Sequence, residues 1–295
     1  MRGVRSLAIQ IVIGVLTFSA LPVVQAPALD RAAPFIATPY ATVKRMLEIA
    51  GVKTGELVAD LGSGDGRIPI AAAKDFGARG LGIELNPHLV ERSRANAERA
   101  GVSDRVTFLQ QDLFKTDLRE IDVLTMYLLQ EVTVTLQPQI LAQMRPGARV
   151  VSHAFPMGGW EPDAVYRSGR IYLWVVPAHA AGRWSVHDPA ETFTLRLDQT
   201  FQKIAGTADF GGRSEPIRHA VLKGAEFSFE VAVGGQTRRY RGTIEADTIQ
   251  GTSETGPWRA TRLERAAVTV QNPNIVPAGR TTMPPNHGPA PIILP

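Results

Sequence analysis

The sequence predicts an α/β protein in which a mainly parallel sheet, with helices on both faces, is followed by a small antiparallel β module. Three observations support this fold class. Short apolar runs alternate with amphipathic segments over residues 39–154, which is typical of repeated β-α units with right-handed crossovers. A glycine-rich turn over residues 62–66 follows the first apolar run. Beyond Gly182 the helical periodicity ends, and short alternating runs separated by glycines replace it.

The α/β part is expected to begin with a helix over residues 39–51, because its apolar residues fall on one face at helical spacing. The strand that starts at Val58 then runs into the glycine-rich turn, and a helix follows over residues 69–76. Pro138 is expected to delay or kink the helix before the fifth strand. The other predicted elements are strands over residues 78–83, 106–110, 122–127 and 150–154, and helices over residues 88–100 and 132–144.

Acidic residues follow the second and third predicted strands. Glu84 comes a little over twenty residues after the glycine-rich turn, and Asp112 follows the third strand. Open α/β sheets bind ligands outside the carboxyl ends of their strands, where Glu84 could bond both hydroxyls of a ribose and Asp112 could lie near an adenine amine. Each acid alone has a second interpretation, because Glu84 could be a solvated strand end and Asp112 could cap a helix that begins near Leu113.

The glycine-rich turn and the two acids together resemble the cofactor motifs of class I S-adenosylmethionine-dependent methyltransferases, which have a Rossmann-like sheet. The resemblance covers roughly residues 34–177. It implies that the turn packs against the methionine part of S-adenosylmethionine, that Glu84 holds the ribose, and that residues 171–176 belong to a terminal antiparallel hairpin. The residues assigned to the cofactor are Thr38, Pro39, Asp60, Gly62, Ser63, Gly64, Asp65, Gly66, Glu84, Asp112 and Leu113. Asp65 could instead cap the next helix.

A narrower resemblance appears in the Pro-Phe-Ile-Ala-Thr-Pro segment at residues 34–39, in Tyr127-Leu128-Leu129, and in residues 172–177. These segments are similar to protein-lysine methyltransferases related to the enzyme that modifies the ATP synthase c subunit, and to their bacterial relatives. The resemblance implies methyl transfer to an amine, with a protein lysine as the expected acceptor and a small molecule as the alternative. Tyr127 and His153, at the tips of the fourth and fifth strands, are the catalytic candidates, although each could be a packed structural residue.

Composition excludes several kinds of site. The 295 residues include no cysteine, which excludes disulfides, thiol catalysis and thiolate metal sites. The six histidines are scattered, so no metal site is expected. The net charge is only +4 and no dense basic run appears, so a nucleic-acid partner is not expected.

The N-terminal segment conflicts with an intracellular enzyme. Met1 to Arg5 carries two arginines, residues 6–24 are strongly apolar, and Ala26-Pro27-Ala28 matches a signal-peptidase site. A signal peptide over residues 1–28 is the first interpretation, and a membrane anchor is the second. The expected location is therefore exported, periplasmic or membrane-anchored, with the cytosolic face of a membrane as the alternative. A non-catalytic exported binding protein with a relic Rossmann-like domain is the competing hypothesis, because S-adenosylmethionine is made in the cytosol.

The predicted domains are a methyltransferase domain over residues 29–180, an antiparallel β module over residues 181–268, and a disordered proline-rich tail over residues 269–295. The β module is expected to be either a sheet or a partly closed barrel. Its predicted strands cover residues 193–201, 202–208, 225–233, 237–245 and 248–252, and residues 258–262 close the series.

Overall fold

The computed structural model describes residues 36–270 and 292–294. The predicted signal peptide or anchor over residues 1–28 and most of the predicted proline-rich tail lie outside the described residues. Residues 36–270 and 292–294 contain no helix that is long and apolar enough to cross a membrane.

The α/β part of the described chain is built from short, regular elements. They are α1 (Tyr40–Ile49), β1 (Leu57–Leu61), α2 (Arg67–Phe76), β2 (Arg79–Glu84), α3 (Pro87–Ala100), β3 (Val106–Gln110), η1 (Leu113–Lys115), β4 (Val123–Met126), α4 (Gln130–Gln143), β5 (Arg149–His153), β6 (Ala164–Tyr166), η2 (Arg167–Gly169), β7 (Ile171–Val175) and β16 (Ile292–Leu294).

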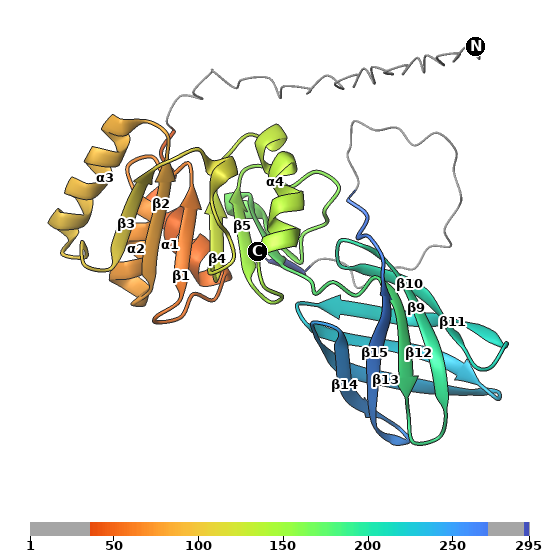
Figure 1. Cartoon of the computed structure of the whole chain (residues 1–295). Coiled ribbons are helices and arrows are strands. Elements are labelled where there is room, and N and C mark those ends of the chain that lie inside the picture. The colour runs from red at the N-terminus through yellow and green to blue at the C-terminus, as the bar shows by residue number, and fades with distance from the viewer. Residues whose placement is uncertain (1–35, 271–291, 295) are drawn as a thin grey trace, which may run out of the picture. The chain divides into compact units, whose positions relative to one another are not determined.

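These strands form one mixed sheet in the order β16-β6-β7-β5-β4-β1-β2-β3 (Figure 1). Strands β1 to β5 are parallel to one another, and β7 is antiparallel to both β5 and β6. The predicted parallel sheet with a terminal antiparallel hairpin is therefore confirmed. Strand β6 is only three residues long and was not among the predicted strands, because such a short run has no readable period.

Helices cover both faces of this sheet. Val58 and Val123 point to the face that α1 and α2 cover, and they share a buried cluster with residues of both helices. Ala59 and Leu124 point to the opposite face, where they pack with α4. Successive strand residues point to opposite faces, so strands buried on both sides read as continuous apolar runs.

Local sequence signals set the ends of α3. The Asn86 side chain accepts from His88 N at 3.0 Å, Pro87 occupies the first turn, and Gly101 ends the helix with φ of 68°. A capping asparagine, a proline at the start and a left-handed glycine at the end are the usual local boundaries of a helix.

The expected delay of the helix start by Pro138 was wrong, because α4 begins at Gln130 and continues through this proline. Pro138 lies on the exposed side of the helix, and its missing N–H removes one bond to the Val134 carbonyl. On the opposite side Leu136 and Ile140 are fully buried. Burial of these apolar side chains outweighs the loss of one helical hydrogen bond.

The second part of the chain is a closed barrel of antiparallel strands (Figure 1). Each strand pairs with the next, and the last pairs with the first between Arg259 and His187. The structure thus confirms the antiparallel β module and decides for a closed barrel. Two of its strands, β8 and β11, were not predicted. The strands are β8 (Gly182–His187), β9 (Thr192–Thr200), β10 (Lys203–Asp209), β11 (Ser214–Lys223), β12 (Glu226–Val233), β13 (Gln236–Glu245), β14 (Thr248–Ser253) and β15 (Gly256–Arg265).

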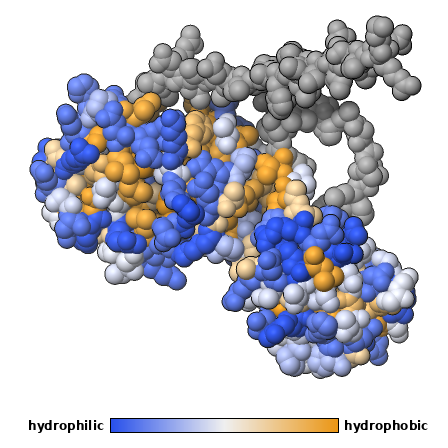
Figure 2. All heavy atoms as spheres, in the orientation of Figure 1, coloured by the Kyte–Doolittle hydropathy of each residue, from blue (hydrophilic) through white to orange (hydrophobic). Residues whose placement is uncertain are grey.

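Aromatic side chains fill the barrel interior. The Tyr240 ring stacks on Phe229 at 4.8 Å between centroids and meets Trp258 edge-on at 5.4 Å. These rings belong to one continuous buried cluster with Trp184 and Phe193. The barrel surface seen in Figure 2 is largely hydrophilic, as expected for strands whose residues alternate between core and solvent. The interior is thus a packed core.

Candidate functional site

The predicted site residues follow five neighbouring strands at one edge of the sheet. In spatial order these strands are β3, β2, β1, β4 and β5, and their tips carry Asp112, Glu84, the glycine-rich turn, Tyr127 and His153. Adjacent strands lie about 4.8 Å apart, so the tips of β2 and β5 are separated by roughly 14 Å. The edge is therefore wide enough for two ligands placed side by side, one over each half.

Three glycines make the turn after β1. Gly62, Gly64 and Gly66 have φ of 75°, 55° and 79°, which residues with side chains rarely adopt. A Cβ added to Gly62 would lie 3.0 Å from Leu128 Cδ2, and one added to Gly66 would lie 2.6 Å from Phe108 Cζ. The turn needs glycine both for its conformation and for the closeness of its neighbours.

The Glu84 carboxylate connects the glycine-rich turn to the tip of β2 through hydrogen bonds. Its Oε2 accepts from Gly64 N at 2.9 Å, and its Oε1 accepts from Leu85 N and Asn86 N, also at 2.9 Å. The structure therefore excludes the alternative of a merely solvated strand end. A carboxylate has about four acceptor positions and these bonds use three of them, so Oε2 keeps one position for a ligand hydroxyl.

Asp60 is a buried acid beneath the turn. Its carboxylate accepts from Thr125 Oγ1 at 2.8 Å, and only 3% of the residue is exposed. The pKa of Asp60 is raised to about 7, mainly by burial; the Thr125 hydroxyl opposes this shift, and the negative charges of Glu84 and Asp65 contribute to it. A cation bound nearby would favour the charged form of Asp60.

Asp65 forms an ion pair and is not a helix cap. Arg67 donates to both of its carboxylate oxygens, at 2.8 Å and 2.6 Å, while Gly66 occupies the cap position of α2 without a side-chain bond. Burial alone would raise the pKa of Asp65, but the bonds and charge of Arg67 leave it lowered. Arg67 also donates to Thr38 O at 2.6 Å, which fixes the segment ahead of Pro39 over the turn.

Asp112 caps the short helix η1, since Oδ1 accepts from Phe114 N at 3.0 Å. This bond leaves Oδ2 as the atom that would meet a ligand. Leu113 is half-buried and packs on the sheet beside it. The Ser63 hydroxyl is buried, faces Gly82 and has no hydrogen-bond partner among the described residues, while Ser63 N donates to Ile83 O at 3.0 Å.

The tips of β4 and β5 bring the two catalytic candidates together. The Tyr127 and His153 ring centroids are 4.3 Å apart. Thr38 Oγ1 lies 3.4 Å from His153 Nδ1, which leaves His153 Nε2 as the ring nitrogen that can meet an incoming group. Burial, and then the charge of Arg170, lower the pKa of His153. The imidazole is therefore neutral near pH 7 and able to accept a proton.

The sequence reasoning missed one aromatic residue at this edge. Phe155, two residues beyond β5, stacks on Tyr127 with 6.4 Å between ring centroids. An aromatic residue just past a strand tip could have indicated a site residue, but the orientation of the Phe155 side chain depends on the turn at Ala154, which the sequence does not reveal.

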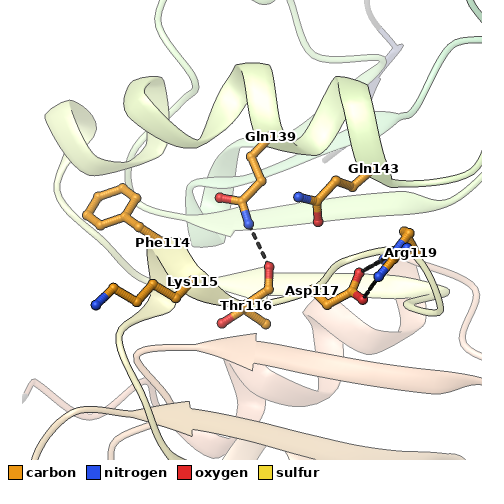
Figure 3. A pocket seen from close by; sticks show the side chains of 7 residues that line it. All are labelled: Phe114, Lys115, Thr116, Asp117, Arg119, Gln139 and Gln143. Carbon is orange, nitrogen blue, oxygen red and sulfur yellow. Dashed lines mark hydrogen bonds and ion pairs between the residues drawn. The ribbon is translucent and has the colours of Figure 1, made fainter.

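A separate hollow of about 490 Å³ lies between the segment after β3 and helix α4 (Figure 3). Figure 3 shows Gln139 donating to Thr116 and the ion pair between Asp117 and Arg119 along its lining. None of the residues assigned to the cofactor lines it, so this hollow is not the candidate site. Within residues 36–270, no cluster of three or more histidines or acids is placed to hold a metal ion.

Known proteins resemble the α/β part of the chain. Residues 60–164 match the family described as the ANTKMT methyltransferase domain. A protein-lysine N-methyltransferase from Saccharolobus islandicus is 40% identical over 153 residues, which are 50% of this chain and 95% of that protein. The adenine nucleotide translocase lysine N-methyltransferase of Mus musculus is 37% identical over 149 residues, covering 50% of this chain and 65% of that protein.

Among solved structures, an RNA methyltransferase from Salinibacter ruber in complex with S-adenosyl-L-homocysteine is 48% identical, with a TM-score of 0.46. The match covers 48% of this chain and 93% of that one.

Proposed function

Since the chain belongs to the S-adenosylmethionine-dependent protein-lysine methyltransferases, we propose that it methylates the side-chain amine of a lysine in a protein substrate. One observation carries this proposal. A glycine-rich turn with Glu84 at one half of the sheet edge adjoins the Tyr127 and His153 pair at the other half. The first half suits the methyl donor and the second half suits the acceptor.

The residues of the first half fit S-adenosylmethionine. Glu84 and Asp112 provide carboxylate oxygens for the ribose and the adenine amine, and the turn at Gly62 has no side chain that would block the ligand. Asp65 is charged but paired with Arg67, and Asp60, whose pKa is about 7, would add negative charge beneath the turn once a nearby cation favours its ionised form. When bound, the cofactor supplies an electrophilic methyl group on a positively charged sulfur, which is the charge that this acidic half favours.

The residues of the second half prepare the amine. A lysine ammonium must lose a proton before its nitrogen can attack, and the role of accepting that proton is assigned to His153 Nε2, because Nδ1 faces Thr38 and the imidazole is neutral near pH 7. With S-adenosylmethionine bound, the neutral amine would attack its methyl carbon, and the electron pair of the broken carbon–sulfur bond would stay on sulfur. The Tyr127 ring orients the amine by its π face. Alignment and exclusion of water account for most of the catalysis that this chain can supply.

Exposed apolar side chains support a protein acceptor over a small polar amine. Ile36 and Tyr40, two residues to either side of Thr38, are 62% and 67% exposed, and Leu129, two residues beyond Tyr127, is 50% exposed. Exposed apolar residues gathered near a site are typical of protein-binding surfaces.

Calorimetric titration of S-adenosylmethionine and S-adenosylhomocysteine into the full chain tests the donor half. We expect micromolar binding, weakened in Glu84→Ala by about 1–3 kcal/mol because the partners of the carboxylate are left unpaired. Glu98→Ala, on the exposed side of α3, is the matched control and should bind normally. Absence of binding by folded protein would overturn the proposal.

The acceptor is tested with labelled S-adenosylmethionine on cell proteins and on RNA separately, followed by mass spectrometry of labelled peptides. Label on lysine side chains is the expected result. Label on RNA alone would replace the lysine proposal with another acceptor.

We also propose that the N-terminal segment brings the chain to a membrane or across it. The two arginines before the apolar residues 6–24 and the Ala26-Pro27-Ala28 sequence support this proposal. Cell fractionation with N-terminal sequencing should find the chain beginning at Leu29, or intact in the membrane fraction. Intact chain found only in the soluble cytosolic fraction would contradict the proposal.

A further inference from the structure

The backbone turns sharply directly after β5. Ala154 has φ of 68°, in the left-handed region that residues with side chains rarely adopt, and the residue is buried. Phe155 N donates to His153 O at 2.9 Å, which closes a three-residue turn. Strained backbone of this kind concentrates at functional sites, so the side chains that this turn brings together are candidates for a binding site.

Hydrogen bonds hold the strained turn in place. Ala154 N donates to Arg170 O at 2.7 Å, and the fully buried Ser152 donates through Oγ to Phe155 O at 2.5 Å. Because the backbone on both sides of Ala154 is tied to the fold, the direction of the Phe155 side chain is set by the sheet.

The turn gathers three rings at the acceptor half of the edge. The Tyr127 ring is tilted by 49° to His153 and by 25° to Phe155, with centroids 4.3 Å and 6.4 Å away. All three residues are half-buried, so each ring keeps some surface accessible to a ligand. The rings come from the tips of the neighbouring strands β4 and β5.

Aromatic faces select among amines by charge and by hydration. Each methyl group added to an ammonium replaces an N–H donor, and a quaternary ammonium keeps its charge with no N–H at all. Aromatic faces attract such cations without needing a hydrogen bond. The acids Asp60, Asp65 and Glu84 lie instead at the tips of β1 and β2, in the donor half.

We infer that Tyr127, His153 and Phe155 form a binding site for an alkylammonium group, and that Phe155 is a substrate-binding residue that favours amines already carrying methyl groups. The inference rests on the proposed function, and it identifies the acceptor as an amine that is retained through successive transfers.

A pair of ligands of equal shape isolates the contribution of charge. Choline and its neutral counterpart 3,3-dimethyl-1-butanol are titrated into the full chain saturated with S-adenosylhomocysteine, and binding is followed by ligand-observed NMR. Choline should bind about 3- to 30-fold more tightly than the alcohol. Phe155→Leu keeps apolar volume but removes the ring, and the ratio should fall toward one. Phe155→Tyr keeps the ring and should preserve the ratio.

Phe210→Leu, a half-buried phenylalanine in the barrel, is the matched control and should leave the ratio unchanged. If Phe155→Leu does not fold, Phe155→Met replaces it. A ratio of one in the unaltered chain, or a ratio that survives loss of the ring in a folded variant, would overturn the inference. Failure of the unaltered chain to bind S-adenosylhomocysteine would instead reject the proposed function, so the two failures are distinct.

Discussion

At the scale of single residues, the site combines an acid that is costly to ionise with a histidine that stays neutral. Burial makes the charged form of Asp60 unfavourable in the folded protein, and the acids around it add to the penalty. His153 is held uncharged by burial and by Arg170. The raised pKa of Asp60 lowers stability at neutral pH, whereas the lowered pKa of His153 lowers stability only under acidic conditions, where an unfolded histidine is protonated. Both arrangements suit a site where a cation and a neutral amine must meet.

Asp60→Asn should stabilise the protein at pH 8 and weaken donor binding. The pKa of Asp60 is about 7 when folded, above its unfolded value near 3.9, so the folded state holds the proton more tightly and stability falls as pH rises between these values. Asparagine cannot ionise. Its free energy of unfolding at pH 8 should exceed that of the unaltered chain by on the order of 2–4 kcal/mol, and the gain should shrink toward pH 4.

Urea unfolding between pH 4 and pH 8 measures this gain, with the exposed Asp104→Asn as control. Calorimetry should show that Asp60→Asn weakens S-adenosylmethionine more than S-adenosylhomocysteine, because only the former carries the sulfonium charge. Equal weakening of both ligands would show that Asp60 does not sense that charge.

The pH dependence of methyl transfer should report His153. Because the pKa of His153 lies below its usual value of about 6.5, the rate should be constant through neutral pH and fall only under more acidic conditions. His153→Gln should reduce kcat by about a hundredfold or more and remove this acidic limb. Arg170→Gln removes a nearby positive charge and should shift the limb to higher pH. His88→Gln, at an exposed histidine, is the control. If the pH–rate profiles of His153→Gln and Arg170→Gln both match that of the unaltered chain, a group other than His153 accepts the proton from the amine.

At the scale of elements, turns at the ends of the strands place the functional groups. The glycine-rich turn after β1 depends on conformations that only glycine adopts easily, and the turn after β5 forces Ala154 into a similar region. The glycine-rich turn follows from its local sequence, because glycines adopt these conformations without steric cost. The turn after β5 is imposed by hydrogen bonds with Arg170 and Ser152.

A pair of glycine substitutions separates strain from crowding. Gly66 and Gly101 both have left-handed φ, but a Cβ at Gly66 would lie 2.6 Å from Phe108, while one at Gly101 would meet open space. Gly101→Ala should cost about 1–2 kcal/mol for the backbone conformation alone. Gly66→Ala should cost roughly a further 1–3 kcal/mol and should weaken cofactor binding. Thermal unfolding measures both, and equal costs would mean that the Phe108 ring moves aside freely.

At the scale of the whole described chain, sheet order decides which residues meet. Asp112, Glu84, Tyr127 and His153 are spread along the sequence, yet parallel strands bring their tips to one edge. The barrel supplies none of the assigned site residues. Its Phe201 stacks on Trp160 at 5.2 Å between centroids, in the same buried cluster as residues of the sheet.

Phe201→Ala should therefore lower stability without changing the cofactor site. Loss of a buried phenylalanine costs about 3–5 kcal/mol, and here it would also uncover Trp160. Unfolding monitored by tryptophan fluorescence measures the loss, and calorimetry at a temperature where the variant is folded should give an unchanged affinity for S-adenosylhomocysteine. Phe193→Ala, inside the barrel and away from Trp160, is the control for general destabilisation. A weakened affinity specific to Phe201→Ala would mean that the barrel supports the site.

The sequence by itself determined the alternation of strands and helices, the glycine-rich turn, and the acids Glu84 and Asp112 at the strand tips. These features could be predicted because hydrophobic period and turn chemistry act over a few neighbouring residues. The role of Asp112 as a helix cap was also one of the two interpretations that the sequence offered for this residue.

Only the tertiary structure decided the path of α4 through Pro138, the closure of the barrel between β8 and β15, and the grouping of Phe155 with Tyr127 and His153. Each depends on contacts between residues far apart in the chain. Burial on one side of α4 overrides the proline, and pairing over more than seventy residues closes the barrel between His187 and Arg259. The bond from Ala154 N to Arg170 O, just before β7, holds the turn at Ala154. Such long-range contacts leave no periodic trace in a local window of sequence, which is why the donor half of the site could be predicted more completely than the acceptor half.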